Sequence, residues 1–405
     1  MVIKDEEQPL HILFFPFLAP GHLIPIADMA VLFATRGVKC AILTTPVNAQ
    51  VIRSAVDRAN DSSRGTEGAL AIDIAVVPFP GVECAPALNS AADRKKFFHG
   101  ARLLLREPFD RFLVENRPDA VVTDSFFNWS ADAAAEHGVP RIAFLGSSLF
   151  SRACSGTTVR NNPVEAAPDD PDALVLLPGL PHLVELRRSQ MTEPKKRPEH
   201  WAFFQRMNAA DQRSYGEVFN TFHELEPDYL EHYTTTLGRR VWLVGPVAFA
   251  SKDAATRGDR GFIIRGWAPQ MLILTHLAVG GFVTHCGWNS TLEAVSAGVP
   301  MVTWPRYADQ FYNEKLVVEL LKVGVGVGSA DYASKLETRR VIGGELIAEV
   351  IGKVMGDGEE AEAIREKAQE LGEKARRAVA KVGSSYDDVG RLVEELMARR
   401  SSVDV

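Results

Sequence analysis

Short apolar runs alternate with longer stretches of helical periodicity along most of the chain. Strands that alternate with helices in this way are typical of parallel α/β sheets. The runs expected to form strands are His11–Phe17, Val38–Thr44, Ile72–Val77, Ala120–Thr123, Arg141–Phe144, Val218–Phe222, Val241–Val244, Phe262–Ile264, Val279–Val283, Met301–Thr303 and Val323–Val327. The stretches expected to form helices are Leu23–Thr35, Arg94–Glu115, Trp129–His137, Trp201–Arg213, Asp228–Leu237, Arg339–Met355, Glu359–Lys381 and Tyr386–Arg399.

The composition changes where two halves of this pattern meet. Residues 248–261 are small and polar, which indicates a linker. We therefore expect one Rossmann-like domain over residues 1–247 and a second over residues 262–380, with the active site in the cleft between them. Residues 155–197 are rich in Pro, Asp and Arg, and we expect them to be irregular.

Composition and charge exclude several classes of protein. The 405 residues include 45 Lys and Arg against 52 Asp and Glu, a net charge of −7, so no excess of cations is available to bind nucleic acid. The four cysteines are scattered and form no Cys-x-x-Cys motif, which argues against a disulfide framework or a zinc site. No apolar stretch approaches the roughly 18 residues of a membrane span, and no signal-peptide pattern is visible. We therefore expect a cytoplasmic protein with neither a membrane span nor a nucleic-acid partner.

The densest motif begins at Trp267-Ala268-Pro269-Gln270 and ends at Asp309-Gln310. In its middle a strand ends at His285, a sharp turn follows, and a helix begins near Asn289-Ser290. A strand–turn–helix unit of this kind points free amide groups and the helix dipole at an anion such as a phosphate. An alternative needs no ligand, because Ser290-x-x-Glu293 also fits a helix capping box in which Asn289 would be an N-cap.

A second pair of polar residues lies in the N-terminal half. His22 follows the first strand at the start of a helix, and Asp124 ends the strand that begins at Ala120. The carboxyl ends of parallel strands face one edge of a sheet, where ligands bind, so we expect the two side chains to lie within hydrogen-bond reach. Imidazole titrates near neutral pH and suits removal of a proton from a hydroxyl. The alternative at both positions is a helix cap.

These motifs resemble one known family. The segment Trp267–Gln310 is similar, at nearly every diagnostic position, to the signature segment of plant family 1 UDP-glycosyltransferases, the secondary-product glycosyltransferases. The segment from Phe14 to Pro46 resembles the first βαβ unit of the same family. The resemblance implies the GT-B fold, an α/β architecture of two Rossmann-like domains that face a cleft. It also implies that His22 is the general base on the acceptor hydroxyl and that Asp124 holds its other ring nitrogen.

The resemblance further implies a set of donor-binding residues. Ser147 stands where the family usually carries a threonine, and its hydroxyl would contact the sugar. The other implied contacts are Trp267 and Ala268 on the uracil, Gln270 and Glu293 on the ribose, His285, Asn289 and Ser290 on the diphosphate, and Trp288, Asp309 and Gln310 on the sugar. Glutamine at the last of these positions is associated with glucose donors.

One departure from the family is large. After Val247 the family carries a strand, a phosphate-contacting loop, a helix and a second strand, whereas here only residues 248–261 fill that interval. We therefore expect a shortened second domain, with Phe262–Ile264 paired beside Val279–Val283 in a sheet of about four strands. Loss of the loop's hydrogen bonds would lower donor affinity about tenfold or more. We expect residues 381–405 to form a helix that packs back on the N-terminal domain.

The sequence thus predicts an inverting, UDP-glucose-dependent glucosyltransferase that acts on a hydroxyl of a small hydrophobic plant metabolite such as a flavonoid, another phenolic or a terpenoid. It is expected to act as a monomer without a metal or cofactor, UDP-glucose being a co-substrate. The alternative is a truncated relative, catalytically weak or inactive, that at most binds small molecules.

Overall fold

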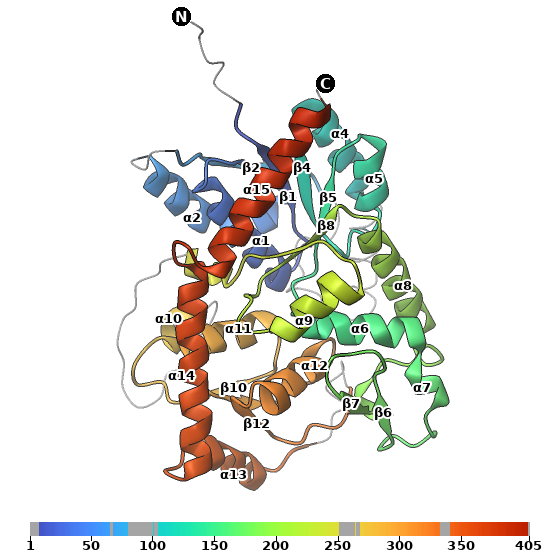
Figure 1. Ribbon diagram of the computed structural model, residues 1–405, viewed down its shortest axis with the longest axis vertical. Helices are drawn as coiled ribbons and strands as arrows, with labels where there is room; N and C mark the ends of the chain where they lie inside the picture. The colour runs from blue at the N-terminus through green and yellow to red at the C-terminus, as the bar shows by residue number, and fades with distance from the viewer. Residues whose placement is uncertain are drawn as a thin grey trace, which may run out of the picture.

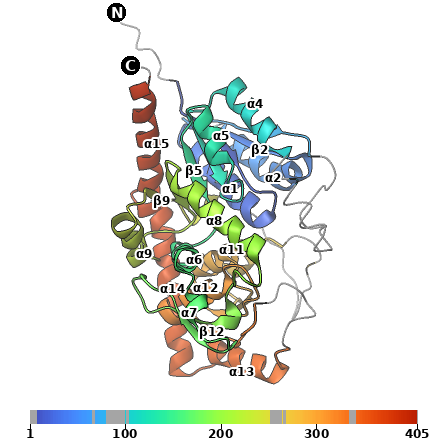
Figure 2. The ribbon, with the colours of Figure 1, turned by 90° about the vertical axis from the view of Figure 1, so that its right-hand side faces the viewer.

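The computed structural model describes residues 8–64, 68–79, 100, 104–250, 264, 268–332 and 341–403. Two α/β units lie one above the other along the long axis of the molecule (Figure 1). The N-terminal unit carries the larger sheet, and the smaller unit carries a second sheet formed between residues 282 and 326. Two long C-terminal helices, α14 (Glu359–Val379) and α15 (Ser384–Val403), run along the side of both units (Figure 2).

The N-terminal unit is built on a parallel sheet with the strand order β3-β2-β1-β4-β5-β8-β9. The order reverses between β1 and β4, which makes the carboxyl ends of these two strands the switch point where ligands bind in such sheets. The strands are β1 (His11–Phe15), β2 (Lys39–Thr44), β3 (Ile72–Val76), β4 (Ala120–Asp124), β5 (Arg141–Phe144), β8 (Gly216–Phe219) and β9 (Val241–Leu243). The helices of this unit include α1 (Pro20–Ala34), α2 (Pro46–Ser63), α4 (Arg106–Asn116), α5 (Ser130–Glu136), α8 (Pro198–Gln212) and α9 (Pro227–Glu231).

Successive side chains of the central strands enter two different cores. On β1, Ile12 and Phe14 pack with α1, α2 and α15, whereas Leu13 and Phe15 pack with α4 and α5. Alternation between two buried faces explains why these strands read as continuous apolar runs in the sequence.

Most predicted elements are present with small shifts at their ends. The strands Arg141–Phe144 and Met301–Thr303 are confirmed residue for residue. The first strand ends at Phe15 rather than Phe17, because Pro16 has no N–H to donate to the sheet. Helix α1 begins at Pro20 rather than Leu23, since proline is favoured in the first turn of a helix.

The expectation that residues 155–197 are irregular is wrong. Helix α6 (Leu149–Asn161) enters this region, a short helix α7 (Pro163–Ala166) follows, and β6 (Leu174–Leu176) pairs with β7 (Glu185–Arg187) in an antiparallel hairpin. Helix α6 was missed because its buried face is rich in small polar residues, which gives a weak apolar period.

The smaller unit holds a parallel sheet with the order β10-β11-β12 in the described part of the chain. Its strands are β10 (Phe282–Thr284), β11 (Met301–Thr303) and β12 (Gly324–Gly326), and its helices are α10 (Gln270–Leu274), α11 (Trp288–Ala297), α12 (Gln310–Lys315), α13 (Gly344–Met355) and α14.

The predicted pairing of Phe262–Ile264 with Val279–Val283 does not appear in this sheet. Phe262 and Ile263 lie outside the described residues, as does most of the expected linker. Ile264 is described, is in no strand and is 39% exposed. Three of the four expected strands are present among the described residues. The fourth falls almost wholly outside them, so its pairing stays a prediction.

Helix α15 packs against the N-terminal unit. Its residues Val389, Leu392 and Leu396 are buried in the core shared with α1 and β1. The guanidinium of Arg36 lies 3.5 Å from the centroid of the Tyr386 ring and adds a cation–π contact at the start of the helix. The C-terminal segment thus bridges both units, since α14 packs on α11 of the smaller one.

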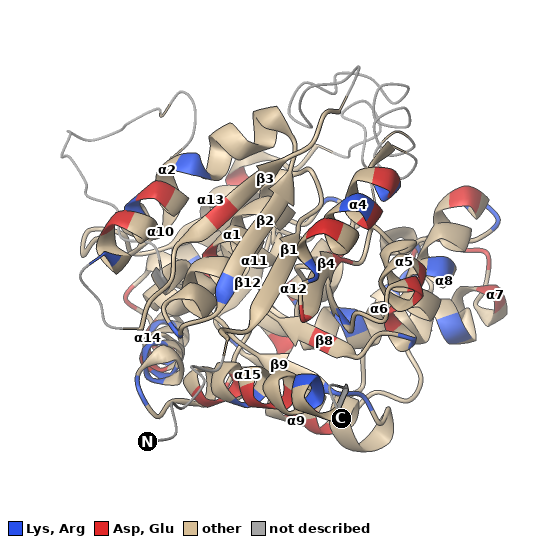
Figure 3. Cartoon of the chain, turned by 90° about the horizontal axis from the view of Figure 1, so that it is seen from above, with Lys and Arg blue, Asp and Glu red and all other residues tan. Residues whose placement is uncertain are grey.

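The charges lie mostly on the peripheral helices, where basic and acidic residues are interspersed, and the central strands are nearly free of them (Figure 3). No helix in the described ranges combines the length and the apolar composition that crossing a bilayer requires. Nor do three or more His, Cys, Asp or Glu side chains gather into a group that could hold a metal ion in those ranges.

A buried carboxylate, Glu226, holds the amino end of α6. It accepts hydrogen bonds from the backbone N–H of Phe150 at 2.8 Å and from the hydroxyl of Thr221 at 2.6 Å. Burial raises the pKa of Glu226 to about 7, although these donors lower it. The folded protein therefore retains a proton on Glu226 that the unfolded chain releases at lower pH.

This proton makes stability depend on pH in a specific direction. Because the folded-state pKa is the higher one, the contribution of Glu226 to the free energy of unfolding falls as the pH rises from about 5 to about 7.5. Glu226→Gln removes this titration and should reduce the fall by roughly 2 kcal/mol. Urea unfolding at pH 5 and at pH 7.5 measures the change in the free energy of unfolding. Glu224→Gln, at an exposed neighbouring position, is the control. Equal pH slopes in wild type and Glu226→Gln would contradict this account.

Candidate active site

His22 and Asp124 meet at the switch point of the N-terminal sheet. His22 is in the first turn of α1, which follows β1, and Asp124 is the last residue of β4. Nδ1 of His22 lies 2.7 Å from Oδ2 of Asp124, so the expected contact is present. The other carboxylate oxygen of Asp124 accepts a hydrogen bond from the backbone N–H of Phe126 at 2.9 Å. The carboxylate is fully buried and fixed at both oxygens.

The surroundings of His22 prepare it to accept a proton. Burial lowers the pKa of His22, but the charge and hydrogen bond of Asp124 outweigh it, and the pKa is raised from 6.5. The bond to Asp124 occupies Nδ1, which leaves Nε2 as the ring nitrogen that can take a proton from a substrate. The buried carboxylate would then stabilise the imidazolium that forms.

A cleft between the two units collects most of the predicted donor-binding residues. His22 and Gly21 contribute to it from the N-terminal unit. The predicted residues that line it are Ala268, Gln270, His285, Trp288, Asn289, Ser290, Glu293 and Asp309. Trp267, predicted to stack on a base, lies outside the described residues. The cleft therefore joins the strand–turn–helix motif to the candidate base.

The start of α11 favours the anion site over the capping box. The N-cap is Gly287, which places Asn289 and Ser290 inside the first turn, and no side chain caps the helix. The free N–H groups of this turn border the cleft. A Cβ at Gly287 would lie 2.5 Å from Nε2 of His285, so only glycine leaves room for that ring.

The side chains of Gln270, Ser290 and Glu293 form one polar cluster in the cleft. The Gln270 amide donates to the Ser290 hydroxyl at 3.0 Å and to the Glu293 carboxylate at 2.9 Å. Burial raises the pKa of Glu293, and the bond from Gln270 lowers it. A carboxylate with one donor satisfied can accept further hydrogen bonds from a diol.

Three residues that the resemblance assigns to the sugar need separate description. The indole N–H of Trp288 donates to the backbone oxygen of Asn220 at 2.8 Å, and the residue is 3% exposed, so this donor is already paired although Trp288 lines the cleft; its contact with a sugar stays a prediction. The side-chain oxygen of Gln310 accepts from the backbone N–H groups of Arg306 and Tyr307, and Gln310 lines neither cavity of the site. The third is Ser147.

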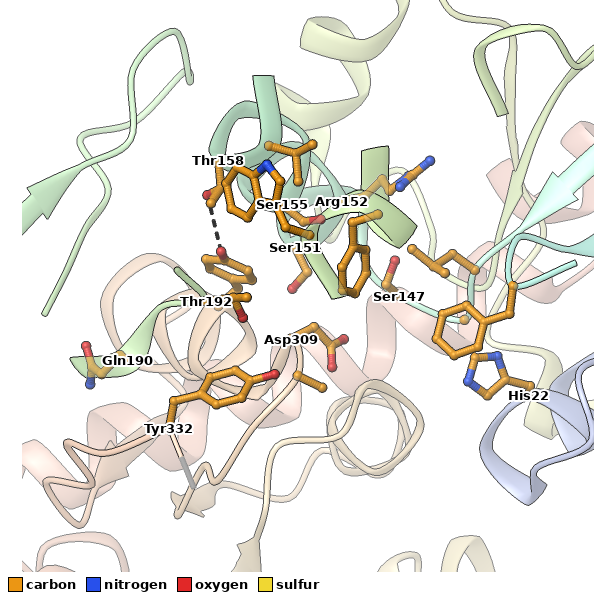
Figure 4. Close-up of a pocket in the computed structure, with 18 residues that line it drawn as sticks. His22, Ser147, Ser151, Arg152, Ser155, Thr158, Gln190, Thr192, Asp309 and Tyr332 are labelled. Carbon is orange, nitrogen blue, oxygen red and sulfur yellow. Dashed lines mark hydrogen bonds between the residues drawn. The ribbon is translucent and has the colours of Figure 1, made fainter. Parts of the chain in front are cut away.

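Ser147 borders a second cavity, which lies beside the cleft (Figure 4). Its hydroxyl is buried and has no hydrogen-bond partner among the described residues. Aromatic rings form much of the wall, and a row of hydroxyls on α6 forms another part. The aromatic residues are Phe126, Trp201, Phe204, Tyr312 and Tyr332, and the hydroxyls on α6 belong to Ser151, Ser155 and Thr158; Ser147 precedes the helix.

The cleft and the aromatic cavity meet at three residues. His22, Gly146 and Asp309 line both. Gly146 adopts a left-handed φ of 72°, which glycine reaches without strain. A molecule in each space would therefore meet the other beside Nε2 of His22. Burial raises the pKa of Asp309 at this junction, while a hydrogen bond from Asn313 and the nearby His22 lower it.

Sequence reasoning missed Asn313 and the hydroxyl row of α6. Asn313 comes three residues after the end of the recognised motif, between the aromatic pair Phe311-Tyr312 and the charged pair Glu314-Lys315. An amide at a core position indicates a buried polar network, because a buried amide without hydrogen-bond partners would destabilise the fold.

Comparisons with known proteins bear on this site. A family model described as UDP-glucoronosyl and UDP-glucosyl transferase matches residues 245–332. The scopoletin glucosyltransferase of Nicotiana tabacum is 36% identical over 481 aligned positions, which cover 97% of this chain and 99% of that protein. The UDP-glucose flavonoid 3-O-glucosyltransferase 7 of Fragaria ananassa is 35% identical, with 96% of each chain covered.

A solved structure shares the architecture. UGT73P12 of Glycyrrhiza uralensis, complexed with glycyrrhetinic acid 3-O-monoglucuronide, matches with a TM-score of 0.88 and 32% identity over 98% of each chain. The 481 aligned positions with the Nicotiana protein exceed the 405 residues here, so at least 76 of them have no counterpart in this chain. These missing positions lie inside the alignment, so the chain is shortened internally relative to that protein.

Proposed function

Because this chain belongs to the plant family 1 UDP-glycosyltransferases and has their GT-B fold, we propose that it transfers glucose from UDP-glucose to a hydroxyl of a small hydroxylated plant metabolite. The observation that carries this proposal is the junction of the two cavities at His22 and Asp309. One cavity has the groups that suit a nucleotide sugar, and the other has the aromatic wall that suits a flat or polycyclic acceptor.

Transfer would proceed in one displacement. Nε2 of His22 takes the proton of the acceptor hydroxyl, and the acceptor oxygen forms a bond to the anomeric carbon of glucose. The bond from that carbon to the UDP oxygen breaks, and UDP leaves with the electron pair. Attack opposite the leaving group inverts the anomeric configuration. Asp124 keeps Nδ1 protonated and stabilises the positive charge on the ring.

The donor would lie along the start of α11. The free N–H groups of the first turn, with His285, Asn289 and Ser290, would hold the diphosphate and stabilise the charge on the departing UDP. Gln270 and Glu293 would bind the ribose hydroxyls, and Asp309 a hydroxyl of the glucose. We propose that no metal is needed for this step; turnover that persists in excess EDTA would support it.

The acceptor class rests on the aromatic cavity and on the relatives. The Nicotiana protein is named for scopoletin and the Fragaria protein for flavonoids, both small hydroxylated aromatics. We propose a phenolic acceptor of this kind or, by likeness to the Glycyrrhiza protein complexed with glycyrrhetinic acid 3-O-monoglucuronide, a terpenoid. A screen of purified protein with UDP-glucose and hydroxylated metabolites, read as acceptor-dependent release of UDP, tests the proposal. If no acceptor causes release of UDP, the result would favour the alternative of a catalytically weak or inactive relative. Cytoplasmic location, monomeric state and lowered donor affinity stay predictions.

Glu293→Ala should weaken nucleotide binding. Loss of the carboxylate removes hydrogen bonds to the ribose, each worth roughly 1.5–3 kcal/mol, so the Kd for UDP should rise about tenfold or more. Isothermal titration calorimetry with UDP measures the change. Glu349→Ala, an exposed glutamate on α13, is the control. An unchanged Kd in Glu293→Ala would show that this carboxylate only orders the local structure.

A further inference from the structure

The side chain of Asn313 joins three parts of the site. Asn313 lies on α12 and is fully buried. Its amide nitrogen donates to the backbone oxygen of Cys286 at 2.8 Å and to Oδ2 of Asp309 at 3.1 Å. Its amide oxygen accepts from the hydroxyl of Ser151 at 2.5 Å. Two donors and an acceptor at this reach are what an asparagine supplies, whereas aspartate has no donor and leucine has neither.

The first contact fixes the turn before α11. Cys286 has a φ of 65°, a left-handed conformation that is uncommon outside glycine. It separates His285 from Gly287, the N-cap of α11. The hydrogen bond from Asn313 to the Cys286 oxygen therefore holds the peptide that directs the first turn of α11 toward the donor cleft.

The second contact orients Asp309. This carboxylate is at the junction of the cleft and the aromatic cavity, where both substrates would meet. With Oδ2 bound by Asn313, Oδ1 is the oxygen available to a sugar hydroxyl. The same bond favours the ionised carboxylate, which accepts hydrogen bonds more strongly than a neutral acid.

The third contact crosses to the N-terminal unit. Ser151 is in the first turn of α6, and both Ser151 and Asp309 line the aromatic cavity (Figure 4). The Ser151 hydroxyl donates a hydrogen bond to the Asn313 amide oxygen, and the Asn313 amide nitrogen donates one to Asp309. One amide thus links the acceptor side of the site to the sugar side.

We propose that Asn313 is a positioning residue, which aligns Asp309 and the Cys286 turn with α6 so that the donor sugar lies correctly against the acceptor. The inference rests on the proposed function. It assigns no contact between Asn313 and a substrate: Asn313 acts through Asp309 and through the turn.

The test uses Asn313→Asp, which keeps the shape and the acceptor oxygen, loses both donors and faces Asp309 with a second carboxylate. Calorimetry with UDP and with UDP-glucose should show that the loss of affinity for UDP-glucose exceeds the loss for UDP by about tenfold. Asn116→Asp, the same change at an exposed asparagine of α4, should leave both affinities unchanged.

A double-mutant cycle with Asp309→Ala identifies the route of action. Asn313→Asp alone should lower kcat about tenfold or more, but in the Asp309→Ala background by less than about threefold, because one of the two groups it positions is then absent and the new carboxylate no longer faces Asp309. Ser151→Ala keeps Asn313 but removes its partner on α6. It should lower kcat by a smaller factor, and again by less in the Asp309→Ala background. This variant replaces Asn313→Asp in the test if Asn313→Asp does not fold.

Two results together would overturn the inference and show a purely structural residue. Asn313→Asp would lose the same affinity for UDP as for UDP-glucose, and its effect on kcat would be as large in the Asp309→Ala background as in the wild type. Wild-type kcat in Asn313→Asp would overturn it too. Failure of the proposed function looks different: wild-type protein would then release no UDP with any acceptor, and the inference would fall with it.

Discussion

His22→Ala should lower kcat by roughly 10²–10⁴-fold and leave the affinity for UDP-glucose within about threefold of wild type. Alanine has no group to take the proton of the acceptor hydroxyl, whereas under the proposal the donor would be held mainly by residues of the smaller unit. The initial rate of UDP release measures kcat, and calorimetry measures the affinity.

The chain offers a matched control for this substitution. His223 also pairs with a buried carboxylate, Asp388 at 3.1 Å, and its pKa is likewise raised by that hydrogen bond. It lines neither the donor cleft nor the aromatic cavity. We therefore expect His223→Ala to have the kcat of the wild type. Comparable rates in His22→Ala and His223→Ala would show that His22 is not the base.

Asp124→Asn should cost roughly 10²-fold in kcat and should also move the pH profile. The amide cannot stabilise the imidazolium, so the pKa of His22 falls. Since the base must be neutral to act, activity in the wild type is lost as the pH drops through the His22 pKa, which lies above 6.5. In Asp124→Asn this acidic limb should shift to lower pH while the plateau rate falls.

A pH profile of kcat/KM for both proteins measures this shift. Asp132→Asn, an exposed aspartate that pairs with Arg213, is the control and should keep the wild-type profile. An acidic limb at the same pH in wild type and Asp124→Asn would contradict the pairing of Asp124 with the catalytic imidazole.

The N-terminal sheet and its switch point were predictable because their physics is local. Strands buried on both faces must be apolar throughout, and Pro16 marks where β1 ends. Once β1 and β4 were placed, parallel pairing alone brought His22 and Asp124 to the same edge.

Features that depend on contacts distant in sequence were not predictable in this way. The indole of Trp288 is bonded to Asn220, 68 positions away, and nothing near either residue indicates the pairing. Gln310 turned its side chain onto the adjacent backbone because two free N–H groups lie within reach. Helix α6 packs a few apolar residues such as Phe150 into the core, and its first turn is bound by distant polar partners, Glu226 and Asn313.

The most direct test of the account is the anomeric configuration of the product. Purified protein is incubated with UDP-glucose, whose glucose is α-linked, and with an acceptor from the screen, and the product is examined by proton NMR. Single displacement at the junction of the two cavities predicts a β-glucoside formed in step with acceptor-dependent UDP release. An α-glucoside, or free glucose released without acceptor, would contradict it.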